Sequence, residues 1–400
     1  MSRAALETSP GARATRLART AVLAIFCMNG AVVAHWYARI PAVKERLQAS
    51  DGALGLVLLA PALGAMICMP IVGALTGRLG SRRLTLACGV FLSACTCVLA
   101  TAPSLPLLAL ALLAWGGGGG GLDVSMNGQG VAIERTYGRP IMSSFHAAFS
   151  GGGMAGAVIG GRLADAGISP EAHLLGAGLF SMAVILAASR FLLRSAGKVP
   201  VADAAGQAPP GSAWPPRWLL SLGIIGLCCF IGEGAMAEWS AVYLRQNLGT
   251  SEAYATTGFA AFSLMMAVGR LCGDRLTQRF GPRALVASGG WLAASSLGIG
   301  LLLGTPLAAV IACGCVGAGL STVAPLAFGA AGRNSDNPGR AIATVTTVSY
   351  FGFFLGPPLI GLVSQAFSLR VGLGVVVVGA MVFALLAGAR SSRLGGPPRG

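Results

Sequence analysis

Two carboxylates lie inside an otherwise apolar stretch of this sequence, and they are the first candidates for chemistry. Glu233 and Glu238 fall within residues 231–243 (IGEGAMAEWSAVY), in a hydrophobic run that begins near Trp218. An ionised side chain in hydrocarbon is costly, so such residues face a cavity, a partner or a proton path. Five residues of helix put the two carboxylates about 140° apart. We expect one to line a cavity and the other to face a neighbouring helix or the cavity rim. The alternative is that both are structural and pair with arginines on adjacent helices.

Two further polar groups occur at helical spacing inside apolar stretches. Asp123 and Asn127 are four residues apart and share a helical face. This stripe suits a hydroxylated ligand or a proton site, and an interhelical hydrogen-bond pair is the alternative. His35 and Arg39 also share a face, with Trp36 beside them. The alternative for Arg39 is that its long side chain reaches back to the membrane interface.

The remaining titratable side chains give weaker patterns. His146 stands four residues from Ser150 and could relay a proton, because histidine titrates near neutral pH; a packing hydrogen bond is the alternative. The 3 histidines have no spacing relation to cysteines or carboxylates, so no metal site is expected. The 10 cysteines fall in apolar stretches without a CxxC pair and are expected to be buried thiols. We predict no cofactor and no enzymatic activity, since no nucleophile–base pair is visible.

The elements that position these residues follow from composition. The chain has 400 residues, of which 54% are hydrophobic and 10% charged, and its mean hydropathy is +0.74. A soluble protein carries about 25% charged residues, so this composition indicates an integral membrane protein. The net charge of +15 would suggest nucleic acid in a soluble protein. Here the basic residues cluster in short loops on one membrane side, and no nucleic-acid partner is expected.

Twelve apolar segments, each long enough to cross a hydrocarbon core of ~30 Å, predict an all-α fold with twelve transmembrane helices. They lie at about 18–39, 52–75, 84–103, 106–132, 141–165, 172–194, 218–244, 253–275, 284–303, 306–331, 341–364 and 370–389. A polar stretch at 195–217 reads as a cytoplasmic linker between six-helix bundles at 19–194 and 218–389. Residues 1–18 and 390–400 read as cytoplasmic tails. The first segment could be a signal-peptide core, but cleavage would remove His35 and Arg39, and an uncleaved helix is preferred.

The loops predict how the chain is oriented in the membrane. With the N-terminus in the cytoplasm, most of the 28 Lys and Arg residues fall on the cytoplasmic side. Both termini are therefore expected in the cytoplasm, with the chain spanning the cell membrane. In this orientation Arg39 and Glu238 lie at a similar depth near the outer end of their helices. We expect them to pair as an outer gate or substrate anchor.

Two loops repeat at an offset of about 200 residues. The sequence RLGSR at 78–82, after the second segment, matches RFGPR at 279–283, after the eighth. This parallel repeat resembles the major facilitator superfamily, whose loop signature G-x-L-x-D-R-x-G-R-R appears at 73–83 as GALTGRLGSRR. Gly77 replaces the usual aspartate, so this half lacks the acidic residue that the family's motif pairs with its arginines. The residues expected to form this conformational motif in the two halves are Gly73, Gly80, Arg82, Arg83, Arg270, Asp274, Arg279 and Gly281.

Residues 39–41, 121–135, 233–239 and 269–275 resemble the YbjJ-like bacterial branch, which is related at a distance to sugar–proton symporters. The resemblance implies a two-bundle secondary transporter whose first, fourth, seventh and tenth helices line the cavity. No nucleotide-binding motif is present, so ATP is not the expected driver. The expected solute and proton pathway comprises His35, Trp36, Arg39, Asp123, Asn127, His146, Glu233 and Glu238.

The expected partners are a small-molecule substrate, protons and the lipid bilayer, and the chain is expected to act as a monomer. A sugar or small polar metabolite is the favoured solute. Proton-antiport export of amphipathic compounds is the alternative, and a non-transporting membrane sensor on the same scaffold is a third possibility.

Overall fold

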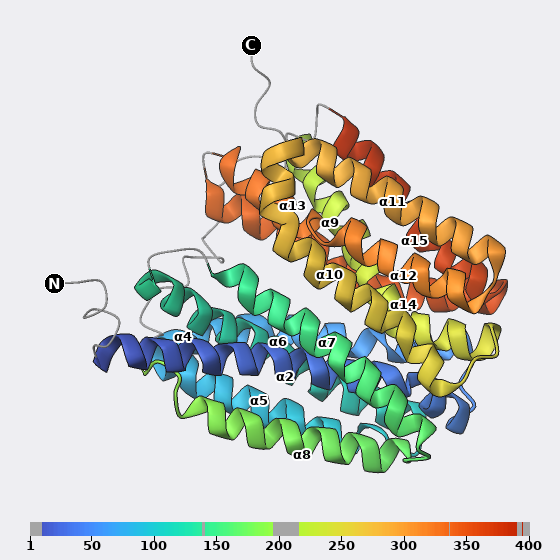
Figure 1. Ribbon diagram of the computed structural model, residues 1–400, viewed down its shortest axis with the longest axis horizontal. Helices are drawn as coiled ribbons and strands as arrows, with labels where there is room; N and C mark the ends of the chain where they lie inside the picture. The colour runs from blue at the N-terminus through green and yellow to red at the C-terminus, as the bar shows by residue number, and fades with distance from the viewer. Residues whose placement is uncertain (1–9, 138–140, 195–215, 336, 390–393, 395–400) are drawn as a thin grey trace. The chain divides into compact units, whose positions relative to one another are not determined.

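The computed structural model describes residues 10–137, 141–194, 216–335, 337–389 and 394. All secondary structure in this part of the chain is helical (Figure 1). The helices are α2 (Pro10–Arg46), α3 (Asp51–Val57), α4 (Leu59–Leu79), α5 (Ser81–Leu99), α6 (Leu105–Tyr137), α7 (Met142–Asp165), α8 (Pro170–Ser189), α9 (Arg217–Val242), a π-helical turn η1 (Tyr243–Asn247), α10 (Glu252–Phe280), α11 (Pro282–Leu303), α12 (Pro306–Leu320), α13 (Val323–Arg333), α14 (Pro338–Ala366) and α15 (Leu369–Gly388).

These helices confirm the expected all-α membrane fold. Consecutive pairs such as α3 with α4 and α12 with α13 each occupy one expected span, so the helices fall into twelve segments. Eleven of the helical segments among the described residues are long and apolar enough to cross a bilayer. The twelfth, α7, is not among them, and its sequence contains the glycine-rich stretch SGGGMAGAVIGG.

The chain divides into two compact units. The first comprises residues 1–39 and 60–201, and the second residues 40–59 and 202–400. Most of the expected linker, 195–215, lies outside the described residues, as do 1–9 of the expected N-terminal tail and nearly all of the C-terminal tail. Residues 10–18 of the N-terminal tail belong to α2.

The second unit includes a short segment from early in the chain, residues 40–59, which contains α3. Lys44 contacts both Asp51 and Gln246, and Gly52 N donates to Gln365 Oε1 at 3.4 Å. Helix α3 also packs closely on α14, because a Cβ at Gly55 would lie 2.6 Å from a backbone carbonyl oxygen of α14. Polar contacts at the helix ends and a close backbone approach therefore bind this segment to the second unit.

In the first unit, α5 packs against both α6 and α8. Helix α6 stays continuous through the run of six glycines at 116–121, although glycine is a poor helix former. A Cβ at Gly120 would come within 2.8 Å of the Cα of Ala65 on α4. The glycines therefore permit the close approach of α6 to its neighbours, as small residues do between membrane helices.

A buried glutamine joins three elements of the first unit, and the sequence alone did not single it out. Gln129 on α6 is fully buried; its Nε2 donates to Ser81 Oγ at 2.9 Å and to Leu193 O at 3.0 Å. Its Oε1 accepts from Leu193 N at 3.0 Å. The side-chain amide thus satisfies both backbone groups of Leu193, just beyond the end of α8.

Gln129→Leu is expected to destabilise the protein by about 3 kcal/mol. The substitution keeps the volume but removes three hydrogen bonds and leaves backbone groups of Leu193 without their side-chain partner. The measurement is the thermal unfolding midpoint in detergent. Val131→Ala, at a more exposed position of the same helix, is the control and should leave the midpoint near wild type. Equal midpoints for the two variants would show that the network contributes nothing.

Candidate functional site

Glu233 and Glu238 both lie on α9, and their surroundings differ. Glu233 Oε1 is 3.9 Å from Arg270 Nη2 on α10 and accepts from Cys229 Sγ at 3.7 Å. Glu233 therefore faces a neighbouring helix and has a basic partner there. For this carboxylate, the contact matches the alternative of a structural pair with an arginine on an adjacent helix.

Glu238 has a different environment five residues later. Its side chain is buried, and Oε2 has no hydrogen-bond partner among the described residues. A buried carboxylate without a partner is expensive to keep ionised. A site of this kind is suited to exchange a proton or to accept a hydrogen bond from a solute.

A break in a helix lies beside Cys229, which contacts Glu233. Helix α12 ends at Leu320 and α13 begins at Val323, so residues 321 and 322 interrupt what was expected as one span. Pro325 explains the break, because proline has no N–H to continue the helical ladder but is tolerated in a first turn. Cys229 Sγ lies 3.8 Å from Leu320 O, one of the carbonyl groups left at the end of α12. The proline was the signal in the sequence that could have predicted this break.

In the first unit, His35 and Arg39 meet a residue that sequence analysis missed. His173 on α8 lies with its Nε2 2.8 Å from His35 Nδ1 and its Nδ1 2.8 Å from Arg39 Nε. Arg39 Nη2 also donates to Ile168 O at 2.8 Å. All three side chains are buried. His173 lies at the start of an apolar segment with no carboxylate or cysteine three or four residues away, so no spacing pattern in the sequence could have identified it.

The other expected pathway residues of the first unit have separate contacts of their own. Asn127 Nδ2 donates to Asp123 Oδ1 at 3.1 Å and to Asp123 O at 2.8 Å, so this pair is formed within α6. His146 on α7 contacts the ring of Phe26 edge-on, with ring centroids 5.4 Å apart. Trp36 is buried and its Nε1 has no hydrogen-bond partner among the described residues. The expected pair of Arg39 with Glu238 stays a prediction.

The expected loop motif marks equivalent turns in the two units. Gly80 has φ 79° at the start of α5 and Gly281 has φ 78° at the start of α11. Residues other than glycine rarely adopt this conformation, which explains the glycine in both copies. Arg82 donates to Arg190 O at 3.4 Å, and Arg279 stacks over Phe280. The remaining motif residues are Gly73 on α4, Arg83 in the first turn of α5, and Arg270 and Asp274 on α10.

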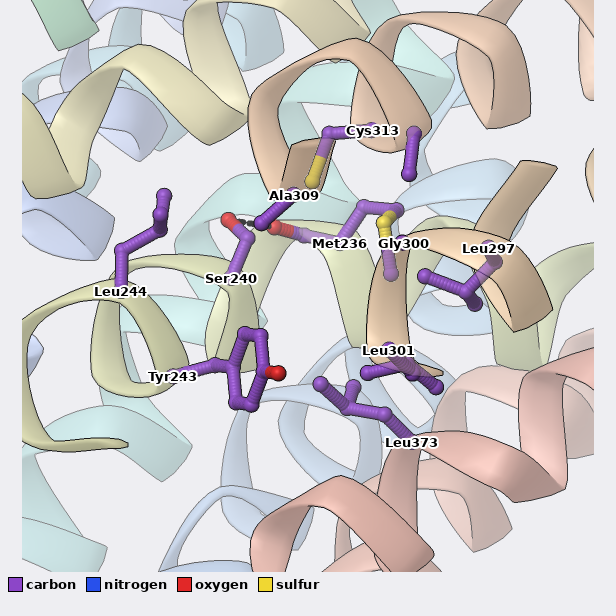
Figure 2. A pocket seen from close by; sticks show the side chains of 11 residues that line it. Met236, Ser240, Tyr243, Leu244, Leu297, Gly300, Leu301, Ala309, Cys313 and Leu373 are labelled. Carbon is purple, nitrogen blue, oxygen red and sulfur yellow. Dashed lines mark hydrogen bonds between the residues drawn. The ribbon is translucent and has the colours of Figure 1, made fainter. Parts of the chain in front are cut away.

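One pocket lies within the second unit, and none of the expected pathway residues lines it (Figure 2). Its walls come from α9, η1, α11, α12 and α15 and are almost entirely apolar. Ser240 directs its hydroxyl to Met236 O within α9, while the hydroxyl of Tyr243 has no partner among the described residues. With so few polar groups available, this pocket is poorly suited to a polar solute.

The contact between Glu233 and Arg270 predicts an energetic coupling. In a double-mutant cycle, Glu233→Gln and Arg270→Gln are expected to couple by about 1 kcal/mol, because the two side chains are in contact and partly shielded from solvent. Thermal unfolding of the two single variants and the double variant measures it. The control cycle replaces Glu233→Gln with Glu238→Gln and should be additive. Additivity in both cycles would show that the contact has no net energy.

Comparisons with known proteins agree with this architecture. The profile of the Major Facilitator Superfamily matches residues 21–357. An uncharacterised MFS-type transporter of Yersinia pestis is 34% identical over 367 residues, which cover 92% of this chain and 93% of the relative. An uncharacterised transporter of Sinorhizobium fredii is 35% identical over 373 residues, covering 92% of this chain and 96% of the relative.

Solved structures share the fold at low sequence identity. One is a bacterial homologue of the human lysosomal transporter Spinster in an inward-facing and occupied conformation. Its TM-score is 0.73 at 16% identity, and the alignment covers 95% of this chain and 97% of the homologue. The nucleoside transporter NupG has a TM-score of 0.66 at 12% identity, and the alignment covers 94% of this chain and 97% of NupG.

Proposed function

Because the chain belongs to the Major Facilitator Superfamily, a family of secondary transporters of small solutes, we propose that it carries a polar solute together with a proton. The solute class we favour is a sugar or another small polar metabolite. Transport would proceed by alternating access in the bacterial inner membrane, with a single chain as the working unit and both termini in the cytoplasm.

The observation that supports proton coupling is that the carboxylate of Glu238 is buried and one of its oxygens lacks a hydrogen-bond partner among the described residues. A coupling group must be able to take up a proton, hold it during the conformational change and release it on the other side. Glu238 is buried and its Oε2 has no hydrogen-bond partner among the described residues, whereas Glu233 already has Arg270 beside it. Glu238 is therefore the better candidate for the protonation site, and Glu233 for a structural partner of α10.

The polar groups of the first unit support a hydrophilic solute. Asp123 and Asn127 together present a carboxylate and an amide on one face of α6. Such a pair suits hydroxyl groups, because the carboxylate accepts and the amide both donates and accepts. We assign this pair to solute binding.

The test of symport uses purified protein in liposomes with a pH-sensitive dye inside. Panels of sugars, small acids and amphipathic cations are added outside. A solute that acidifies the interior supports symport. A solute that makes the interior alkaline indicates exchange of solute for protons instead. If no solute in the panel changes the internal pH while the same protein transports labelled solute, proton coupling is refuted.

The second candidate function is export of amphipathic compounds by proton antiport. A cluster of aromatic rings in the second unit favours it. Phe230 stacks on Phe353 with centroids 4.5 Å apart, and Tyr350 and Phe328 approach it edge-on at 5.4 and 6.4 Å. Such rings stack on aromatic compounds, although a sugar ring uses the same surface. The sign of the internal pH change separates the two functions.

A further inference from the structure

A chain of hydrogen bonds joins three buried side chains of the first unit. It begins at Arg39, passes through His173 and ends at His35, with both nitrogen–nitrogen distances at 2.8 Å. The two imidazole rings are nearly perpendicular, at 87°, with centroids 4.8 Å apart. The chain joins α2 to α8, over 138 residues of sequence.

The direction of this chain follows from the chemistry of arginine. A guanidinium group has donors only, so Arg39 Nε donates and His173 Nδ1 must accept. A neutral imidazole whose Nδ1 accepts carries its proton on Nε2, so His173 Nε2 donates to His35 Nδ1. The same reasoning puts the proton of His35 on its own Nε2. Both rings are therefore neutral, because a proton on either Nδ1 would face a donor.

The last donor of the chain is not used inside the protein. His35 Nε2 has no hydrogen-bond partner among the described residues. The residue as a whole is 8% exposed, so most of the ring is enclosed by the protein. An N–H without a partner at the end of a fixed series of hydrogen bonds is a donor available to a ligand.

The surrounding backbone holds the hydrogen-bonded side chains Arg39, His173 and His35 in place. Arg39 is held a second time by Ile168 O, in the turn between α7 and α8. Helix α7 passes close by, since a Cβ at Gly160 would lie 3.3 Å from His173 Cε1 and 2.8 Å from the Cβ of Ala38. The His35 ring thus has little freedom to turn, and its Nε2–H points in a fixed direction.

We propose that His35 Nε2–H binds an acceptor oxygen of the transported solute, with Arg39 and His173 as positioning residues. This rests on the proposed transport function. The ligand class is a molecule that presents an acceptor oxygen at this point, from a hydroxyl, carbonyl or carboxylate group, and ligands that offer only donors are excluded. The role that follows for His35 is solute binding, and a proton relay through these two rings would first have to break the chain.

The first experiment reads the tautomers directly and does not depend on transport. The protein has 3 histidines, so selective 15N labelling gives few resonances. A His146→Gln variant identifies the resonances of His146 by their loss. His35 and His173 are expected as neutral Nε2–H tautomers with a scalar coupling across the N–H···N bond. An Nδ1–H tautomer or an imidazolium at either position would overturn the proposal.

The second experiment tests the ligand class with three probes that share a ring, namely benzoate, benzamide and benzylammonium. Benzoate and benzamide are expected to shift the His35 Nε2–H resonance, while benzylammonium serves as the control probe that does not shift it. In His173→Phe, which keeps a ring but loses the donor to His35, the apparent Kd of the better probe should rise about tenfold. Equal shifts with all three probes, or no shift with any, would overturn the assignment.

These outcomes are separable from those of the transport assay. If the tautomers and probe shifts appear as expected while no solute changes the internal pH, the binding site stands and the proton coupling fails. If symport is observed but the probes do not shift His35, the proposed function stands and the role of His35 fails.

Discussion

Glu238→Gln is expected to abolish accumulation of the solute against its gradient. One proton that enters with the solute supplies about 2.3 kcal/mol per 100 mV of membrane potential, which corresponds to roughly 50-fold accumulation. Glutamine keeps the size and shape of the side chain but cannot take up the proton. Accumulation in liposomes with an imposed potential should therefore fall to about one, while exchange of labelled for unlabelled solute continues.

Glu233→Gln is the matched control, because it makes the same chemical change five residues, or about 1.4 turns, earlier on α9. Glu233 lies beside Arg270, so its neutralisation is expected to alter stability and rate but to leave accumulation in place. Two results would contradict the assignment of Glu238: wild-type accumulation in Glu238→Gln, or loss of accumulation in Glu233→Gln alone. The second result would move the protonation site to Glu233.

The sequence predicted only part of the difference between Glu233 and Glu238. Their spacing predicted that they face different directions, since five residues of helix fix the angle between them. Which one has a basic partner depends on Arg270, which lies on another helix. Helical periodicity places residues around a single helix and does not place the neighbouring helix, so the identity of the partnered carboxylate had to come from the structure.

The same limit explains which site residues were missed. Asp123 with Asn127 was found because the two residues are four apart on one helix, and their hydrogen bond is present. His173 contacts His35 across 138 residues, and Gln129 holds Leu193 across 64. Contacts of this kind between helices leave no periodic pattern in a single sequence. The spans themselves were predictable because a bilayer imposes long apolar runs whatever the packing between them.

The packing of residues 40–59 within the second unit was also not predictable from the sequence. The hydrophobic pattern places the start of the second span near residue 52, and α3 does begin at Asp51. That this segment packs on α14 depends on a polar contact of Lys44 with Gln246 and on the close approach at Gly55. Neither is a motif. A glycine in a chain with 60 of them carries no signal of its own.

Gly64→Ala and Gly77→Ala, one substitution at two positions of α4, are expected to change stability in opposite directions. A Cβ at Gly64 would overlap the carbonyl oxygen of Leu113 and lie 2.8 Å from Gly117 N, both backbone atoms of α6. Backbone atoms of a packed helix cannot move aside cheaply, so we expect a loss of about 2–3 kcal/mol. At Gly77 there is nothing within 4 Å, and alanine should stabilise the helix by about 0.4–1 kcal/mol.

The measurement is the unfolding midpoint of both variants in detergent, together with the fraction that elutes as a single species in size-exclusion chromatography. Gly64→Ala should unfold well below wild type and give less folded protein, while Gly77→Ala should unfold at or slightly above it. Since the chemical change is identical, the difference between the two variants isolates the close approach of α4 to α6. Equal midpoints would show that the two helices can separate by the width of a methyl group at little cost.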